Sequence, residues 1–226
     1  MTGEKTYIFL VADLSGYTAL TEAHGSQGAA KVIRRFLEIV GISLKPGVRL
    51  AETKGDEVLV VGRDATAVVQ TAVTLVKRVR EETHFPALHA GIHAGKILEQ
   101  GGRFFGAPLN LAARIGAHAK GCQVLVTREV IERLDPRAGI PYQSIGRTKF
   151  RNVREKVSLF NVATGCGKGR PVIIDPVCRM IVDSNRIMPM VVHHGKRYFF
   201  CSQQCADQFS GHPEYYIQNN RIRRPK

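Results

Sequence analysis

Apolar and polar positions divide the first 165 residues into short apolar runs and longer stretches with helical periodicity. Residues 6–12 are apolar and partly β-branched, which predicts a buried strand ending at Asp13. Residues 15–44 place apolar side chains every three or four positions, which predicts an amphipathic helix. Because strands and helices are mixed in this order, we expect an α+β or α/β sandwich on one main sheet. Further helices are predicted at residues 64–82 and 107–119, and further strands at 49–52, 58–61, 88–98 and 122–127.

The turn between two of these strands carries a second acidic residue. Residues 53–56, Thr-Lys-Gly-Asp, have the composition of a hairpin tip, which places Asp56 on or beside a tight turn. A single aspartate beside a glycine usually only shapes the turn. Two carboxylates at the tips of neighbouring strands can instead bind divalent ions that neutralise the charge of a reacting triphosphate. Asp13 and Asp56 are therefore candidates for a metal-binding pair.

Composition and charge narrow the class of protein. The chain has 226 residues, of which 44% are hydrophobic and 23% charged, as in an ordinary globular protein. Its formal net charge of +14 favours anionic partners such as nucleoside triphosphates, but no nucleic-acid-binding motif accompanies the charge, so no specific nucleic acid is expected. The chain lacks an apolar run of the roughly 18 residues that a membrane span needs, and it lacks signal-peptide features, so we expect a cytoplasmic location.

A change of composition marks a second, smaller domain. Residues 164–171, Thr-Gly-Cys-Gly-Lys-Gly-Arg-Pro, are typical of a linker. We therefore predict a first domain at residues 1–165, a linker at 166–171, a second domain at 172–218 and a basic tail at 219–226.

Three of the five cysteines lie in the second domain with the spacing C-x22-C-x3-C. The last two lie one turn apart if a helix begins there. Thiolates so arranged can share a zinc or copper ion with a histidine as fourth ligand, and buried free cysteines are the alternative. His212 is a weaker candidate ligand, while Cys122 and Cys166 are expected to be a core thiol and a linker thiol. The main candidate ligands are Cys178, Cys201, Cys205, His193 and His194.

Four motifs of the first domain resemble those of class III adenylate/guanylate cyclase catalytic domains. DLSGYT (13–18), GDEV (55–58), GIHAG (91–95) and GAPLNLAARI (106–115) occur in the order and approximate spacing of that family. Residues 144–162 resemble its closing strands, so the resemblance covers about the first 165 residues. It implies a ferredoxin-like α/β sandwich and an enzyme that forms a 3′,5′-cyclic nucleotide and pyrophosphate from a nucleoside triphosphate.

The resemblance also implies roles for individual residues. Asp13 and Asp56 match the metal-binding aspartates, with the backbone carbonyl of Leu14 as a further ligand, which implies two Mg²⁺ or Mn²⁺ ions per site. Asn110 and Arg114 match the pair that stabilises the transition state, and their spacing places both on one helix face. Sites of this family combine the carboxylates of one chain with the Asn and Arg of another, so a head-to-tail homodimer is implied.

The base-reading positions depart from the family pattern. Glu52 resembles the guanylate cyclase choice, because a carboxylate accepts hydrogen bonds from guanine N1–H and N2–H. Arg103 matches neither standard choice, and Lys54 is a possible displaced adenine contact. ATP and GTP both stay open as substrates, with cyclic AMP the more frequent product in the family. If Glu52 and Arg103 pair with each other and close the base pocket, the chain is instead an inactive, nucleotide- or metal-binding sensor.

The second domain resembles a YHS domain, a relative of the TRASH metal-binding modules. DPVCRM, GKRYFFCSQQC and HPEYY carry this resemblance, which implies a small β-rich unit capped by a helix. It also implies binding of zinc or another heavy metal, and regulation of the cyclase by metal or redox state. The final RIRRPK is expected to be solvated. The aromatic residues expected in the small core are Tyr198, Phe199, Phe200, Tyr215 and Tyr216.

Overall fold

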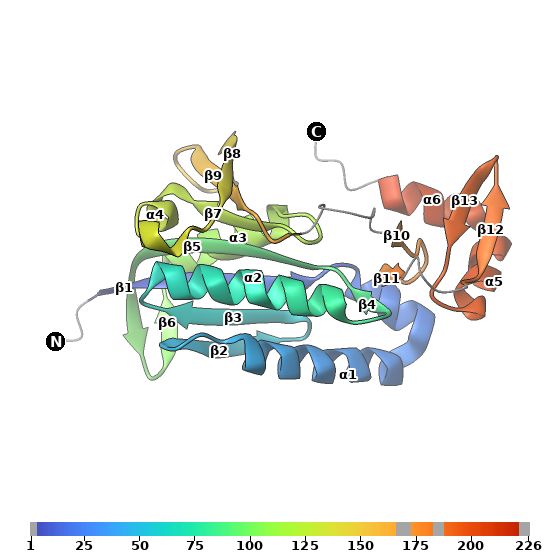
Figure 1. Cartoon of the computed structure of the whole chain (residues 1–226), viewed down its shortest axis with the longest axis horizontal. Helices are drawn as coiled ribbons and strands as arrows, with labels where there is room; N and C mark the ends of the chain where they lie inside the picture. Colours follow the sequence, from blue (N-terminus) through green and yellow to red (C-terminus); the bar gives the residue numbers. More distant parts are fainter. Residues whose placement is uncertain (1–3, 166–172, 183–187, 222–226) are drawn as a thin grey trace.

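A mixed sheet with helices on both faces makes up the first domain (Figure 1). The computed structural model describes residues 4–165, 173–182 and 188–221. The strands of the first range are β1 (Lys5–Leu14), β2 (Val48–Lys54), β3 (Glu57–Gly62), β4 (Phe85–Pro86), β5 (Leu88–Gln100), β6 (Arg103–Phe105), β7 (Val124–Thr127), β8 (Tyr142–Thr148) and β9 (Val157–Val162). The helices are α1 (Tyr17–Ser43), α2 (Ala65–Glu81), α3 (Ala107–His118), α4 (Arg128–Ile131) and a 3₁₀ turn at Pro136–Ala138.

The strand order confirms the predicted α/β sandwich. The main sheet runs β2-β3-β1-β5-β7-β9-β8, and β6 pairs with β5 beside this path. The β5 and β7 strands are parallel, whereas β1 pairs antiparallel with both of its neighbours. The end of β1 and the tip of the β2–β3 hairpin therefore lie side by side at the same end of the strands, because Asp13 is paired with Glu57 across β1 and β3.

Alternate residues of β1 build two separate cores. Ile8 and Leu10 belong to the larger core, beneath α1 and α2. Phe9 and Val11 belong to a second core on the opposite face, beneath α3. This alternation follows from the two-residue repeat of a strand, and it explains why residues 6–12 are apolar without interruption: both faces of β1 are covered.

Helix α3 lies unusually close to the sheet at Gly91. A Cβ atom at this position would fall 2.1 Å from the backbone nitrogen of Gly116 and 2.6 Å from the carbonyl oxygen of Ala112. Only a residue without a side chain allows this approach. Gly91, the first glycine of the GIHAG motif, thereby sets the distance of α3, and of the polar residues on that helix, from the sheet.

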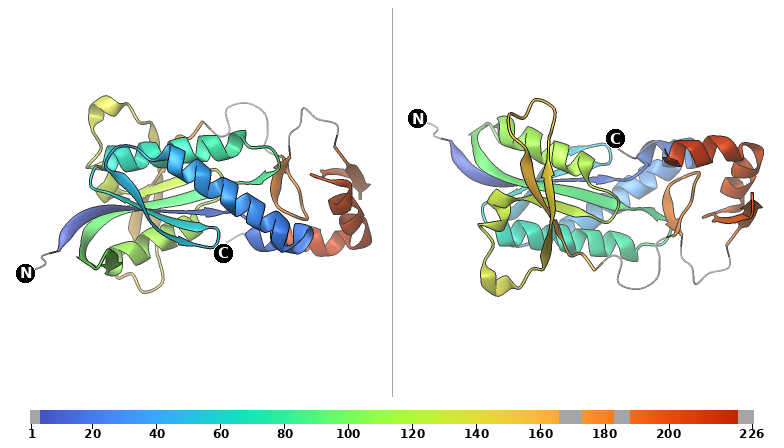
Figure 2. Two further views of the ribbon diagram at one scale, coloured as in Figure 1. Left: turned by 90° about the horizontal axis from the view of Figure 1, so that it is seen from below. Right: turned by 90° about the horizontal axis from the view of Figure 1, so that it is seen from above.

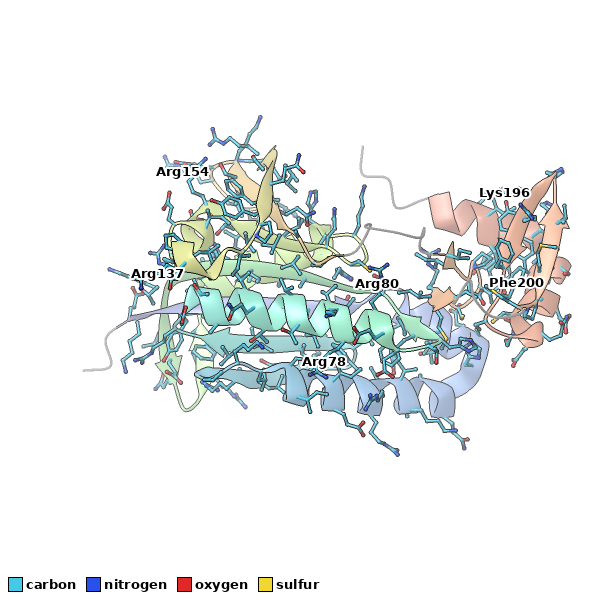
Figure 3. The ribbon with its side chains drawn as sticks, viewed as in Figure 1. Arg78, Arg80, Arg137, Arg154, Lys196 and Phe200 are labelled. Carbon is cyan, nitrogen blue, oxygen red and sulfur yellow. The ribbon has the colours of Figure 1, made fainter. Side chains whose placement is uncertain are left out.

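The second domain has a small aromatic core. It contains β10 (Ile173–Ile174), β11 (Met180–Val182), the hairpin β12 (Met190–His193) and β13 (Lys196–Phe199), and helices α5 (Gln203–Gly211) and α6 (Pro213–Arg221). Phe209 and Phe200 are fully buried and their ring centroids lie 5.2 Å apart; the Phe200 side chain points into the interior of this domain (Figure 3). Tyr198 and Tyr216 pack around Phe209. Tyr215, predicted to be in the core, is 58% exposed and lies outside it.

The two domains share a sheet. Strand β11 pairs with β4 of the first domain, with Met180 opposite Pro86 and Ile181 opposite Phe85. The second domain lies against the end of the sandwich where α1 begins, as the two views of Figure 2 show.

Several predictions from the sequence fall outside the described residues, namely the linker at 166–171 with Cys166 and the last residues, 222–226, of the basic tail. Helix α6 continues to Arg221, into the segment that was predicted as tail. Cys122 is half-buried and contacts the larger core. In the described part of the chain no helix is long and apolar enough to cross a membrane, and the cytoplasmic location stays a prediction.

Candidate functional site

Asp13 and Asp56 lie in contact where β1 ends and the β2–β3 hairpin turns. Asp13 is the penultimate residue of β1, and Asp56 occupies the turn between β2 and β3, which the two-residue Gly-Asp loop forms. Burial, the charge of Asp56 and a hydrogen bond between the two carboxyl groups raise the pKa of Asp13 to about 7. Glu57, opposite Asp13 in the strand register, adds a third negative charge. Carboxylates held together in this way are suited to a divalent cation with a preference for oxygen ligands.

His89 joins this carboxylate pair, which sequence reasoning did not foresee. Its Nε2 atom lies 3.6 Å from Oδ2 of Asp13, and its Nδ1 atom lies 3.0 Å from Oγ of Ser15. The His89 ring is buried, and its residue is paired with Asp13 across β1 and β5. The backbone N–H of Leu14 also donates to the Asp13 carboxylate. These contacts fix the orientation of Asp13 at the end of its strand.

Asn110 and Arg114 both lie on α3, but the structure does not join them to Asp13 in the same chain. Asn110 is exposed and Arg114 is half-buried. The Arg114 guanidinium donates a hydrogen bond to the carbonyl oxygen of Arg151, in the connection between β8 and β9. That connection lies at the edge of the sheet opposite the β2–β3 hairpin. Arg114 therefore points away from the carboxylate pair of its own chain.

The base-reading candidates Glu52 and Arg103 line one pocket of about 420 Å³. The pocket opens beside α3, and its size falls within the range of small-molecule sites. No ion pair joins Glu52 to Arg103 within the described ranges, so the pocket is not closed by such a pair. Lys54 is not among the lining residues and lies opposite Glu57 at the end of the hairpin. The pocket walls are formed by Ala51, Glu52, Leu59, Gly102, Arg103, Phe104, Phe105 and Leu109.

The three cysteines of the second domain come together with a histidine of the first. Cys201 Sγ lies 3.4 Å from Cys178 Sγ and 3.7 Å from Cys205 Sγ. The Nε2 atom of His24, in α1, lies 3.5 Å from Cys201 Sγ and 3.7 Å from Cys205 Sγ. Hydrogen bonds from the neighbouring thiols lower the pKa of Cys205 to about 4, whereas the hydrogen bond to Cys201 raises the pKa of Cys178. The cluster therefore already favours one thiolate.

The structure corrects the expected fourth ligand of this cluster. His193 and His194, which the sequence suggested, contact Glu214 instead: their Nε2 atoms lie 2.9 Å and 3.4 Å from its Oε1 atom. They form a separate, largely exposed group on the β12–β13 hairpin and α6. His212 ends α5 and is exposed, and it does not belong to the group of His24 and the three cysteines.

Asp175 organises the cysteine cluster, and sequence reasoning missed it. It is fully buried, and its Oδ1 atom accepts hydrogen bonds from the backbone N–H groups of Val177 (2.8 Å) and Cys178 (3.4 Å). Its Oδ2 atom accepts one from the N–H of Cys201 at 2.8 Å. Burial raises the pKa of Asp175, and the hydrogen bonds from the N–H groups of Cys201 and Val177 oppose that rise. One carboxylate thus holds both cysteine-bearing loops.

Known proteins resemble this chain in both of its domains. Residues 173–220 match the YHS domain family. A pH-sensitive adenylate cyclase from Mycobacterium tuberculosis is 31% identical over 168 residues, which are 73% of this chain and 42% of the relative. An adenylate cyclase from Streptomyces coelicolor is 34% identical over 125 residues, covering 54% of this chain and 32% of the relative. The chain thus spans less than half the length of these curated relatives.

Solved cyclase structures share the fold of the first domain. An adenylate cyclase of Trypanosoma brucei in its monomeric state superposes with a TM-score of 0.63 at 19% identity, covering 74% of this chain and 91% of that one. The catalytic core of a rhodopsin-guanylyl cyclase with converted specificity, solved with ATPαS, gives a TM-score of 0.65 at 15% identity, covering 71% and 96% of the two chains. The first domain therefore has the same fold as these cyclase structures.

Proposed function

We propose that this chain, a class III cyclase-type domain followed by a C-terminal YHS domain, converts a purine nucleoside triphosphate into a 3′,5′-cyclic nucleotide and pyrophosphate. The observation that carries this proposal is the contact between Asp13 and Asp56, which the pairing of β1 with β3 brings together. Burial and the neighbouring negative charge raise the pKa of Asp13 to about 7. Two carboxylates in contact repel each other when both are ionised, and a divalent cation between them relieves this repulsion. The pair is therefore suited to binding such a cation.

The carboxylates would hold Mg²⁺ or Mn²⁺ close to the end of β1, with the backbone carbonyl of Leu14 as a third oxygen donor. When bound, these ions would supply Lewis-acid activation of the ribose 3′-hydroxyl and neutralise the triphosphate charge. His89 keeps the Asp13 carboxylate in place through the contact of 3.6 Å, and Ser15 holds the other ring nitrogen. Asp13 is thereby oriented before any ligand binds.

Asn110 and Arg114 would act on a substrate held by a second copy of the chain. Arg114 offers a fixed positive charge and planar donors for the pentavalent phosphorus, and Asn110 offers an amide donor beside it. The hydrogen bond from Arg114 to Arg151 directs it away from its own carboxylate pair, which supports a site shared by two chains in a head-to-tail homodimer.

The pocket that contains Glu52 and Arg103 would receive the base. Glu52 accepts hydrogen bonds, which suits guanine, whereas the curated relatives are named adenylate cyclases. Because the two side chains are not joined in an ion pair, the pocket stays open, which argues for a catalytic over an inactive, closed domain. The choice between ATP and GTP is a matter for measurement with both nucleotides.

Complementation between two inactive variants tests the shared site. Asp13→Ala removes the carboxylate half, and Arg114→Ala removes the other half. If each site takes one half from each chain, equal amounts of the two variants form heterodimers with one intact site, and about one quarter of the wild-type activity returns. The assay is cyclic nucleotide formation with Mn²⁺ after mixing.

A matched control separates this result from residual activity. Mixing Asp13→Ala with Asp56→Ala pairs two chains that are defective in the same half, so no activity returns. Full activity of Arg114→Ala alone, or equal recovery in both mixtures, would contradict the shared site.

A further inference from the structure

We propose that the three cysteines of the YHS domain bind one zinc-like ion together with His24, a residue of the cyclase-type domain. The ion would therefore join the two domains of the chain. Its binding does not depend on the proposed cyclase activity.

The spacing of the four donor atoms fits a tetrahedral ion. With zinc–sulfur bonds of about 2.3 Å and zinc–nitrogen bonds of about 2.0–2.1 Å, tetrahedral geometry places sulfurs about 3.8 Å apart and sulfur and nitrogen about 3.6 Å apart. The structure gives 3.4 and 3.7 Å between the sulfurs of Cys201 and its neighbours, and 3.5 and 3.7 Å from His24 Nε2 to two of the sulfurs. All four donor atoms lie within 4.8 Å of one another.

The donor set has the chemistry of a closed structural site. Three thiolates and one imidazole form one of the standard four-ligand sets for zinc, with no position left for water or substrate. Cys178 and Cys205 are fully buried, and Cys201 and His24 are half-buried, so the ion would be shielded from solvent. The hydrogen bonds that the Asp175 carboxylate accepts from backbone N–H groups of the two cysteine-bearing loops hold these loops in place around the ion.

A disulfide is the competing outcome, and the geometry favours it less. A disulfide bond needs sulfurs about 2.05 Å apart, and it would join only two of the three thiols. The observed separations of 3.4 and 3.7 Å lie closer to the value of about 3.8 Å for sulfurs around a shared zinc ion than to that bond length.

Other contacts already place the YHS domain on the first turns of α1. The side-chain amide of Gln204 donates to the carbonyl oxygen of Ala23, the residue before His24, at 3.1 Å. At the start of α1, Gly16 has a φ of 85°, and a Cβ atom there would fall 2.4 Å from Cβ of Arg179 in the YHS domain. Pairing of β11 with β4 adds a third contact. His24 is thus held at the domain boundary, where Figures 1 and 2 place the YHS domain.

The position of His24 connects the ion site to the carboxylate pair through a short stretch of the chain. His24 precedes Gly25, where the helical backbone is interrupted with φ 68° and ψ 173°, and the segment from His24 back to Tyr17 leads directly to Asp13 at the end of β1. An ion on His24 would therefore restrain the start of α1, the segment that follows Asp13 along the chain. This regulatory consequence rests on the proposed function, whereas the ion site does not.

Zinc titration of the reduced, metal-free full chain tests the site without any activity measurement. We expect one zinc ion per chain at the cluster, protection of Cys178, Cys201 and Cys205 from alkylation as read by mass spectrometry, and a shift of one histidine ring nitrogen in NMR spectra of ¹⁵N-histidine-labelled protein. His24→Gln should remove that shift and weaken the cluster's zinc affinity about tenfold or more in competition with a chelator.

The matched control is the double variant His193→Gln/His194→Gln, which removes the other histidine group and should leave zinc affinity within about twofold of wild type. Thermal unfolding of the metal-free variants checks that each is folded. If zinc does not protect the three cysteines, if the histidine shift remains in His24→Gln, or if only the double variant loses affinity, the proposal is overturned. Assignment of the shifted ring nitrogen to His24 in the unmodified protein decides the matter even if a variant fails to fold.

Discussion

Replacing Asp56 by Asn should stabilise the metal-free protein at pH 8 while abolishing cyclic nucleotide formation. Asp13 has its pKa raised from 3.8 to about 7, first by burial and then by the charge of Asp56 and the hydrogen bond to it. The ionised form therefore destabilises the fold. This cost is absent below about pH 4, grows between about pH 4 and pH 7, and is constant above that range. Asn removes the neighbouring charge and keeps an oxygen that can accept the hydrogen bond from protonated Asp13.

The size of the effect follows from the shift and its causes. Each pKa unit corresponds to about 1.4 kcal/mol, so the full rise of about three units is worth at most about 4 kcal/mol. Burial is the largest cause, and Asp56 supplies only part of the rest. The Asp13 side chain is also 35% exposed, so solvent screening reduces the charge effect further. We expect about 1 kcal/mol at pH 8, or a rise in Tm of about 2–4 °C.

Thermal unfolding in Mg²⁺-free buffer at pH 5 and pH 8 measures this difference. Glu155→Gln is the matched control, because it removes one carboxylate from an exposed loop far from the site in the sequence. A destabilising repulsion between Asp13 and Asp56 is contradicted if Asp56→Asn lowers Tm at pH 8, if its stabilisation is equally large at pH 5, or if Glu155→Gln produces the same gain. Added Mg²⁺ should stabilise wild type at pH 8 more than it stabilises Asp56→Asn.

Two further variants test the base pocket and the cysteine cluster. Glu52→Lys replaces a hydrogen-bond acceptor in the base pocket by a donor. It should raise the ratio of kcat/KM for ATP to kcat/KM for GTP by about tenfold or more. An unchanged ratio would show that Glu52 does not recognise the base. Asp175→Asn should weaken zinc binding to the cysteine cluster by about 10–100-fold in chelator competition, because the side chain that holds the two cysteine-bearing loops loses one acceptor oxygen. A zinc affinity equal to that of wild type would show that the loops hold their shape without the carboxylate.

Much of the fold follows from local patterns in the sequence. The runs that predict β1, α1, α2, β5 and α3 are long or strongly periodic, and all five elements form close to their expected bounds. Tyr215 and Tyr216 show where composition misleads: successive helical residues point about 100° apart, so only one of the two can pack on Phe209. The predicted aromatic core therefore lacks Tyr215, and Phe199 is half-buried and belongs to none of the buried clusters of the described residues.

The candidate sites depend more on the register between distant strands. Motif order brought Asp13 and Asp56 together as candidates, but the role of His89 arises only once β5 pairs with β1. His24 lies in a helix far from Cys178 in the sequence, and nothing around it indicates a metal ligand. Asp175 is different: an aspartate that accepts from backbone N–H groups two and three residues further on is a local turn signal that the sequence could have provided.

Incubating the purified chain with Mn²⁺ and either ATP or GTP, and identifying the products by mass spectrometry, tests the proposed cyclase activity. We expect a 3′,5′-cyclic nucleotide and pyrophosphate in equal amounts from at least one of the two substrates, and loss of both in Asp13→Ala. No cyclic product from either nucleotide, or product formation that survives Asp13→Ala, would contradict a cyclase built on the Asp13–Asp56 pair.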